Sequence, residues 1–222
     1  MSPNPFDPTF DRLPGTLPIF PLADVLLLPR ARLPLNVFEP RYLAMVEDAM
    51  AAGNRMIGMI QPSDPGDRSS EPAVYGMGCA GRVTSFSETD DGRYLITLTG
   101  TCRFNVAEEL ATTRGYRRVV PDWSPFESDL DPPGEVELDR PRLVGGLRAY
   151  FKQNGLTANW DAVENTPDER LINSLSMICP LSASEKQALL EAPDLGERAR
   201  LMITMIEMAV FNQNDGNTSA RH

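Results

Sequence analysis

The chain has 222 residues, of which 41% are apolar, and it carries a formal net charge of −10 at pH 7. Its length fits one large domain or two small ones, and its apolar content excludes a wholly disordered chain. The acidic balance disfavours general binding to nucleic-acid backbones and to anionic membrane surfaces.

The N-terminal sequence MSPNPFDPTFDR lacks the basic and apolar regions of a signal peptide, so we expect residues 1–13 to form a disordered arm. Three cysteines without CxxC spacing favour a reducing compartment. We therefore expect a cytoplasmic protein.

The apolar stretch LPIFPLADVLLLPRARLPLNVF, residues 17–38, contains four prolines and three charged residues. Both features exclude a membrane-spanning helix. The pattern instead predicts short buried strands separated by proline turns, namely LPIFPL, VLLLP and LPLNVF. The run Val25–Leu28 is typical of a strand that is covered on both faces.

Residues 40–54 have apolar side chains at helical spacing, with Pro40 in the first turn and Gly53 at the end. The residues that follow are rich in β-formers, and Asp91-Gly92 predicts a hairpin. That hairpin would bring Cys79 and Cys102 opposite each other, within a register error of one or two residues. Strands are expected at 55–60, 74–86, 94–106 and 114–121, with a loop at 61–73.

The segment 121–136 is rich in proline and acidic residues, and we interpret it as a linker between a β-rich subdomain, 14–120, and a helical subdomain, 137–212. Helical patterns cover the second part, and residues 213–222 are expected to form a disordered tail. Two capping boxes are predicted at the starts of helices, Thr166 with Glu169 and Ser182 with Glu185.

Three collinear blocks resemble the N-terminal substrate-binding domain of the Lon protease family. They are LPIFPLADVLLLPRARLPLNVFEPRYLAMVEDAM, GRVTSFSETDDGRYLITLTGTCRFNV and PLSASEKQALLEAPDLGERARLMITMIEMAV, and the likeness covers roughly residues 14–211. The resemblance implies an α+β fold, in which a PUA-like β pseudobarrel with one helix is followed by a small all-α helical bundle.

The resemblance also implies binding of protein clients. In the full protease the domain precedes an ATPase module and a Ser-Lys peptidase module, but no stretch here reads GxxxxGK[ST]. It therefore implies a stand-alone, non-catalytic bacterial protein without a cofactor, to which a peptidase label would come from the family alone. Its expected partners are unfolded or exposed apolar protein segments, with a protease or chaperone as a further candidate. The oligomeric state stays open, a weak dimer included.

Other motifs have simpler interpretations. GMGCAG (76–81) matches GxGxxG, but strand-forming residues follow it where a dinucleotide site needs a helix. The only histidine is His222, so a zinc site and Ser-His or Cys-His catalysis are disfavoured. An acid/base enzyme remains a third hypothesis. The alternative to client binding is an RNA-binding PUA-like module, since three arginines cluster at 114–118.

We expect apolar side chains to form the client site. The helical segment 201–211 is almost wholly apolar and contains a methionine stripe, and methionine adapts to varied apolar ligands. Core packing is the first interpretation of that stripe, and an open stripe that contacts a partner is the competing one. A groove between the two subdomains is the second candidate. The residues predicted to contact a client are Phe38, Trp123, Phe126, Met202 and Met205.

Overall fold

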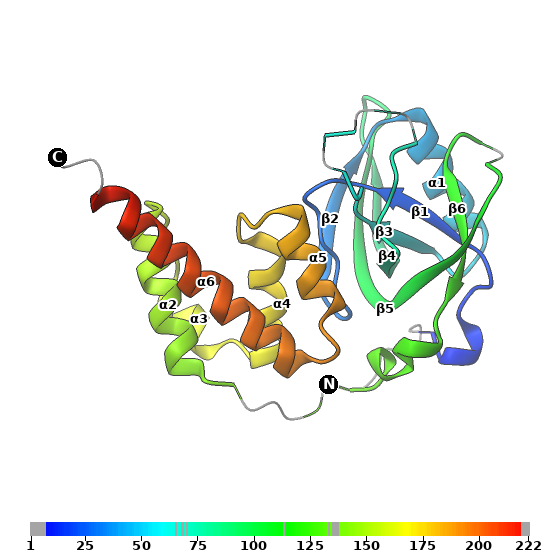
Figure 1. Cartoon of the computed structure of the whole chain (residues 1–222). Coiled ribbons are helices and arrows are strands. Elements are labelled where there is room, and N and C mark those ends of the chain that lie inside the picture. The colour runs from blue at the N-terminus through cyan, green and yellow to red at the C-terminus, as the bar shows by residue number, and fades with distance from the viewer. Residues whose placement is uncertain are drawn as a thin grey trace. The chain divides into compact units, whose positions relative to one another are not determined.

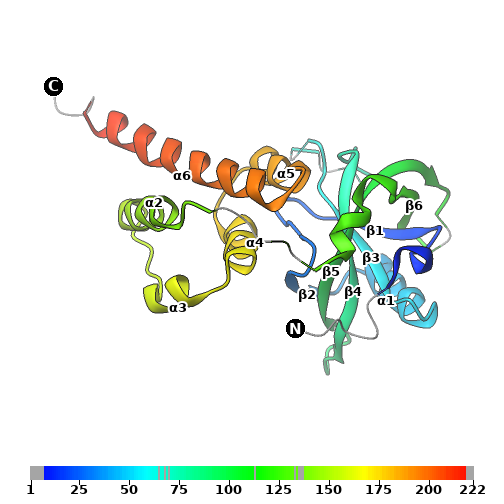
Figure 2. The same cartoon turned by 90° about the horizontal axis from the view of Figure 1, so that it is seen from below.

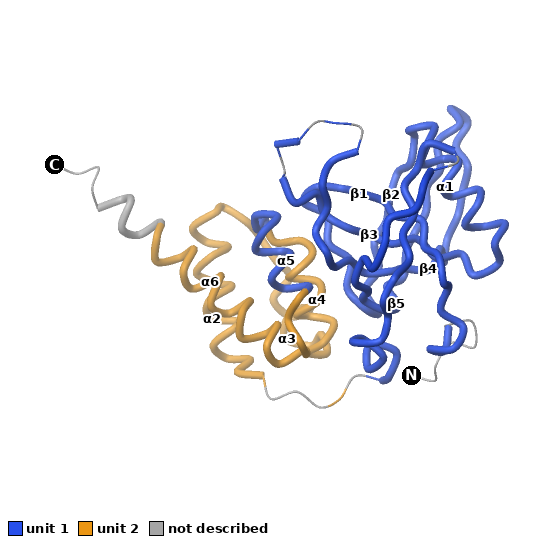
Figure 3. Tube along the Cα trace, turned by 45° about the vertical axis from the view of Figure 1, so that its right-hand side comes forward, with its two compact units in different colours: residues 1–132, 180–190 blue, residues 133–179, 191–222 orange. Residues whose placement is uncertain are grey.

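The computed structural model describes residues 8–64, 66, 67, 69, 71–112, 114–132, 134 and 138–218, with side chains as far as residue 212. The chain divides into two compact units, which Figure 3 shows in different colours. Unit 1 comprises residues 1–132 and 180–190, and unit 2 comprises residues 133–179 and 191–222. A mixed sheet in unit 1 and helices in unit 2 confirm the predicted α+β class.

Unit 1 is built on a six-stranded sheet (Figure 1). The strand order is β2-β5-β4-β3-β1-β6, and β5 also pairs with β6. This extra pairing closes five strands into a barrel, while β2 pairs with β5 alone among the described residues. The strands are β1 (Leu17–Pro21), β2 (Arg32–Val37), β3 (Met56–Ile60), β4 (Met77–Glu88), β5 (Tyr94–Leu110) and β6 (Arg117–Asp122).

Local signals place most of these elements correctly. The helix α1 (Pro40–Ala51) has Pro40 in its first turn and is followed by Gly53 at φ +79°, as predicted. The hairpin between β4 and β5 turns at Gly92, also at φ +79°, a conformation that glycine adopts without steric cost. Thus the turn residues and the period of the apolar residues were sufficient to predict these elements from the sequence.

The prediction of a strand at Val25–Leu28 is wrong. Leu26, Leu27 and Leu28 are buried, but their backbone forms an irregular segment before a turn at Arg30, whose φ is +65°. Backbone hydrogen bonds from Arg30 to Gly100 and from Gly100 to Ala31 hold this segment against β5. The short apolar run therefore predicted correctly that these residues are buried, but it did not predict their backbone conformation.

Glycines allow the barrel to pack closely around Phe104, which is fully buried. A Cβ atom added at Gly78 would lie 2.6 Å from the carbonyl oxygen of Met59 and 2.7 Å from the Phe104 ring. The GMGCAG motif lies across the start of β4, and a register shift follows Ala80. The motif is therefore followed by a strand, as the sequence indicated, and its glycines permit close packing and a bulge.

The cysteine register agrees with the hairpin prediction. Cys102 pairs with Ala80, one residue from Cys79, and all three cysteines are buried and unbridged. Burial, with a smaller contribution from the charge of Asp129, raises the pKa of Cys102 to about 12. The barrel therefore holds Cys102 as a neutral thiol.

We expect this thiol to be nearly unreactive in the folded protein at pH 8, because only about one molecule in ten thousand carries the thiolate. A chromogenic disulfide reagent should report three thiols per chain in denaturant and far fewer, slowly, without it. Because the folded pKa lies above the ordinary value, the stability that this group contributes below about pH 9 is lost as the pH rises toward 12. Rapid labelling of Cys102 in the native protein would contradict this account.

Residues 121–130 differ from the predicted linker. Pro121 and Asp122 end β6, and a 3-10 helix, η2 (Ser124–Leu130), packs Phe126 into the barrel core. This segment packs on the barrel because it carries a buried acid. Asp129 accepts three hydrogen bonds from Arg103 at 2.8–3.0 Å. The proline and acid content indicated an exposed segment, but one of those acids has a partner on β5.

The helix α5 (Ala183–Glu191) contacts the β structure through polar side chains. The Gln61 amide donates to Ala183 O and to Gln187 Oε1, and Lys186 Nζ donates to Asp24 O at 2.6 Å. These contacts place residues 180–190 in unit 1, whereas the sequence analysis assigned them to the helical subdomain. Hydrogen bonds between residues more than 120 positions apart leave no local signal in the sequence.

Unit 2 consists of helices whose apolar faces meet. Both α2 and α4 contact α6, and Leu143, Leu147, Ile172, Met202 and Ile206 are among its buried residues. The helices are α2 (Arg140–Gln153), α3 (Trp160–Asn165), α4 (Asp168–Ile178) and α6 (Leu195–Thr218). Thus α6 extends into the predicted tail, and residues 1–7 of the predicted arm lie outside the described residues.

One of the two predicted capping boxes forms. Ser182 N donates to Glu185 Oε2 at 2.8 Å, and Glu185 N donates to Ser182 Oγ at 3.3 Å. Thr166, in contrast, donates to Ala162 O and closes α3, so α4 begins without a side-chain cap. No helix was predicted at α3, and the last turn of α3 uses the threonine that was assigned to the next helix.

Candidate binding surfaces

Three of the five predicted client-binding residues are buried. Trp123 and Phe126 lie in the core of unit 1, with 9% and 6% of their surfaces exposed. The Trp123 indole donates to Pro14 O at 3.0 Å, and its ring lies edge-on to Phe104. A client could reach these two side chains only by displacing the core, so they are not accessible in this structure.

The methionine stripe of α6 is divided between core and surface. Met202 is fully buried and Met205 is half-buried, whereas Met208 and Phe211 are 60% and 64% exposed. The core explanation therefore applies to Met202. Binding of a client at the predicted residues stays a prediction, and its accessible members are Phe38 and Met205.

Phe38 lies just beyond the end of β2 and is 61% exposed. The Arg93 guanidinium lies 5.8 Å from the centroid of the Phe38 ring. Leu95, the second residue of β5, is 45% exposed. Leu95 was not among the predicted client-binding residues. Its exposure could have been predicted from the sequence. Leu95, Thr97 and Thr99 alternate along β5 and therefore share one face, and the two threonines mark that face as the more polar one.

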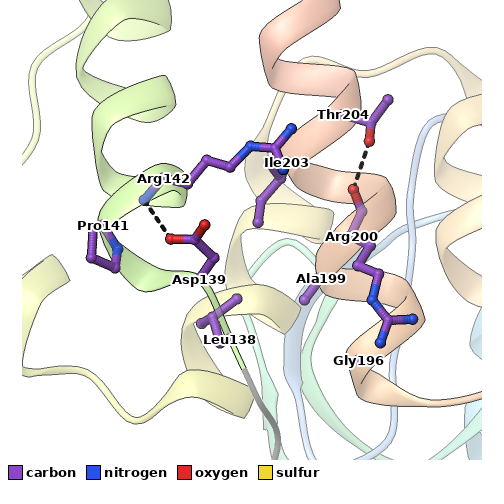
Figure 4. A pocket seen from close by; sticks show the side chains of 9 residues that line it. All are labelled: Leu138, Asp139, Pro141, Arg142, Gly196, Ala199, Arg200, Ile203 and Thr204. Atoms are coloured by element: carbon purple, nitrogen blue, oxygen red, sulfur yellow. Dashed lines mark hydrogen bonds between the residues drawn. The ribbon is translucent and has the colours of Figure 1, made fainter.

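Unit 2 has a hollow between the start of α2 and the first turns of α6 (Figure 4). Its volume is about 720 Å3, and Leu138, Pro141, Ala199 and Ile203 give it apolar walls. The rim is polar: the side chain of Asp139 accepts from the Arg142 backbone at 3.1 Å, and the Thr204 hydroxyl donates to Arg200 O. The exposed lining of this hollow is more polar than apolar, so the hollow does not by itself indicate an apolar ligand.

The arginine cluster at 114–118 is occupied by contacts within unit 1. Arg114 forms ion pairs with Glu47 and Asp48 of α1, and Arg117 forms a bidentate pair with Glu109 of β5. Arg118 donates to Ala111 O. Among the described residues, the carboxylates that pair with Arg114 and Arg117 belong to α1 and β5.

Among the described residues, no group of three His, Cys, Asp or Glu side chains is placed to hold a metal ion. Over the same residues, no helix combines the length and the hydropathy that crossing a bilayer requires.

Comparison with known proteins identifies the family to which the chain is similar. The family model described as the ATP-dependent protease La (LON) substrate-binding domain matches residues 16–208. The chain belongs to this family. The three blocks that suggested the resemblance lie almost wholly within the matched range.

Curated Lon proteases align over most of the chain at low identity. A Lon protease 2 of Sorangium cellulosum is 26% identical over 86% of this chain, and a Lon protease of Dictyoglomus thermophilum is 27% identical over 84%. The alignments cover 24% and 23% of those proteins. The chain therefore spans about a quarter of the length of the curated relatives that it matches.

Solved structures agree with the fold. A Lon N-terminal domain protein from Xanthomonas campestris superposes with a TM-score of 0.61 at 25% identity, covering 85% of this chain and 97% of that one. The N-terminal domain of a Mycobacterium avium complex Lon protease gives 0.58 at 17% identity, covering 86% and 97%. The predicted Lon-type fold is thus confirmed, with a β barrel and a helical unit.

Proposed function

We propose that this protein binds polypeptide segments that expose apolar side chains and does so without catalysing a reaction on them. The observation that carries the proposal is the match of residues 16–208 to a substrate-binding domain. Exposed apolar side chains on both units support it, among them Phe38, Leu95, Ile178, Met208 and Phe211. A cytoplasmic protease or chaperone that receives the bound segment is the expected partner.

The exposed side chains set the expected strength of binding. Burial of apolar surface contributes about 25 cal/mol per Å2, and association and chain ordering cost several kcal/mol. A few scattered apolar side chains therefore support weak binding that tolerates many sequences. Such binding suits a protein that must contact unrelated unfolded clients.

The test measures binding to a second protein, used as the ligand, in an unfolded and a folded state. A fluorescently labelled, reduced and carboxymethylated protein remains unfolded, and its disulfide-intact form is the folded control. We expect anisotropy titrations to show binding of the unfolded form only. Equal binding of both forms, or of neither, would reject the proposal.

A labelled RNA homopolymer is the third ligand, because the alternative function is RNA binding. Affinity for RNA that falls steeply with added salt, combined with no affinity for the unfolded protein, would favour the RNA-binding module. The ion pairs of Arg114 and Arg117 lead us to expect no such affinity.

A further inference from the structure

The sheet of unit 1 has an open edge at β2. Among the described residues β2 pairs with β5 alone, whereas each of the other strands of the sheet pairs with at least two neighbours. Figure 2 shows β2 beside β5, on the side of β5 that faces away from β4. The far side of β2 therefore carries backbone groups that no strand of the described sheet can bind.

Alternate residues of β2 direct their backbone NH and C=O groups away from β5. Gly100 N donates to Ala31 O at 2.9 Å, so the backbone of Ala31, one residue before β2, faces β5. Because successive residues of a strand face opposite neighbours, Arg32, Pro34 and Asn36 face the open edge. They present three carbonyl oxygens but only two NH groups, since proline has none. No hydrogen-bond partner for these groups is found among the described residues.

The apolar inner face of the sheet is incompletely covered at this edge. Leu33 and Leu35 pair with Leu98 and Ile96, which are buried, but the two leucines of β2 are only half-buried. A strand added beside β2 would place every second side chain next to Leu33 and Leu35. Apolar side chains at those alternate positions would remove the two leucines from water.

Resting on the proposed function, we propose that β2 binds an extended client segment as an additional strand of the sheet. The client backbone donates to the three outward carbonyl oxygens and accepts from the NH groups of Arg32 and Asn36. Every second client side chain packs on Leu33 and Leu35. Backbone hydrogen bonds form with any sequence, so this mode of binding selects only for an unfolded chain with apolar residues at alternate positions.

Pro34 favours a client strand over a second copy of this protein as the occupant. It removes the central donor of the open edge, and proline on an exposed edge disfavours pairing between folded copies. Two β2 edges paired with each other would contain this gap twice, whereas a client strand meets it once. The remaining groups of the edge are those that a client backbone can satisfy.

The test uses three labelled peptides in which valine and threonine alternate. One is unmodified, one is N-methylated at its valines and one at its threonines. In an added strand the amides of one residue type face β2 and those of the other face solvent. We expect methylation of one type to weaken binding to the full chain about tenfold, and methylation of the other to change it little. Equal affinities for all three peptides would overturn the proposal.

Three variants of the edge provide a second test. Asn36→Pro removes an outward NH group and should weaken binding of the unmodified peptide about fivefold. Asn36→Ala keeps that NH group and should leave the affinity unchanged. Pro34→Ala supplies the missing donor and should strengthen binding about threefold. Thermal unfolding checks that each variant is folded, and Pro34→Ala tests the proposal even if Asn36→Pro does not fold. Equal losses in Asn36→Ala and Asn36→Pro would contradict binding through the backbone.

Failure of this inference can be distinguished from failure of the proposed function. Binding of the carboxymethylated protein, combined with no effect of peptide methylation, would overturn docking at β2 and leave client binding intact. A wild-type dimer in sedimentation that Asn36→Pro dissociates would assign the edge to a second copy and overturn the inference in the same way. If the wild-type protein bound neither the unmodified peptide nor the carboxymethylated protein, the proposed function itself would fail.

Discussion

Replacing Asp129 with alanine should lower the free energy of unfolding by about 3–5 kcal/mol, because it leaves the Arg103 guanidinium buried without its counter-ion. The two side chains are only 4% and 9% exposed. Arg103 also donates to Leu190 O at 3.2 Å, and its guanidinium lies 5.0 Å from the Phe126 ring centroid. One ion pair therefore ties β5, η2 and the end of α5 together.

Chemical denaturation of Asp129→Ala and of two control variants checks this prediction. Glu207→Ala removes the carboxylate of an exposed ion pair with Arg142 and should change stability little. The double variant R103M/D129L replaces both buried charges with apolar groups and should be more stable than Asp129→Ala alone. Equal effects of Asp129→Ala and Glu207→Ala would show that burial of the pair is unimportant.

Replacing Gly100 with alanine should destabilise the protein by about 3 kcal/mol or more. A Cβ atom at Gly100 would lie 2.0 Å from the carbonyl oxygen of Leu28 and 2.8 Å from its carbonyl carbon. Both atoms belong to backbone, which cannot rotate away as a side chain can. The hydrogen bonds between Gly100 and residues Arg30 and Ala31 would have to lengthen or break.

The matched control is the same substitution in unit 2. Gly145 lies inside α2, and a Cβ atom there would have no neighbour within 4 Å. Gly145→Ala should therefore stabilise the protein by about 0.5–1 kcal/mol, since alanine has the higher helix propensity. Thermal unfolding of both variants should show shifts of opposite sign. A neutral Gly100→Ala would contradict the close approach of the 28–31 segment to β5.

The candidate surface shows where sequence reasoning reaches its limit. The apolar character of Phe38, Trp123, Phe126 and Met202 was evident from the sequence, but it has two possible causes, core packing and client contact. Only burial separates these causes: Phe38 is exposed, and the other three are buried. Burial depends on which distant segments cover a side chain, and Trp123 is covered because it meets Phe104 and Pro14.

Elements with local signals could be predicted from the amino-acid sequence. The helix at Pro40–Ala51, the hairpin at Asp91-Gly92, the box at Ser182 and the helical pattern of α6 depend on neighbours within a few residues. Family resemblance added the fold class. Local backbone and capping energies are independent of the rest of the chain, and for that reason they could be recognised.

Features that need a distant partner became evident only in the folded chain. Tertiary contacts made Val25–Leu28 an irregular segment, placed η2 in the barrel core and joined α5 to unit 1. In each case a polar group forms a hydrogen bond with residues far along the chain, such as Gly100, Arg103 or Gln61. A buried polar group must be paired, and the identity of its partner is a property of the folded chain.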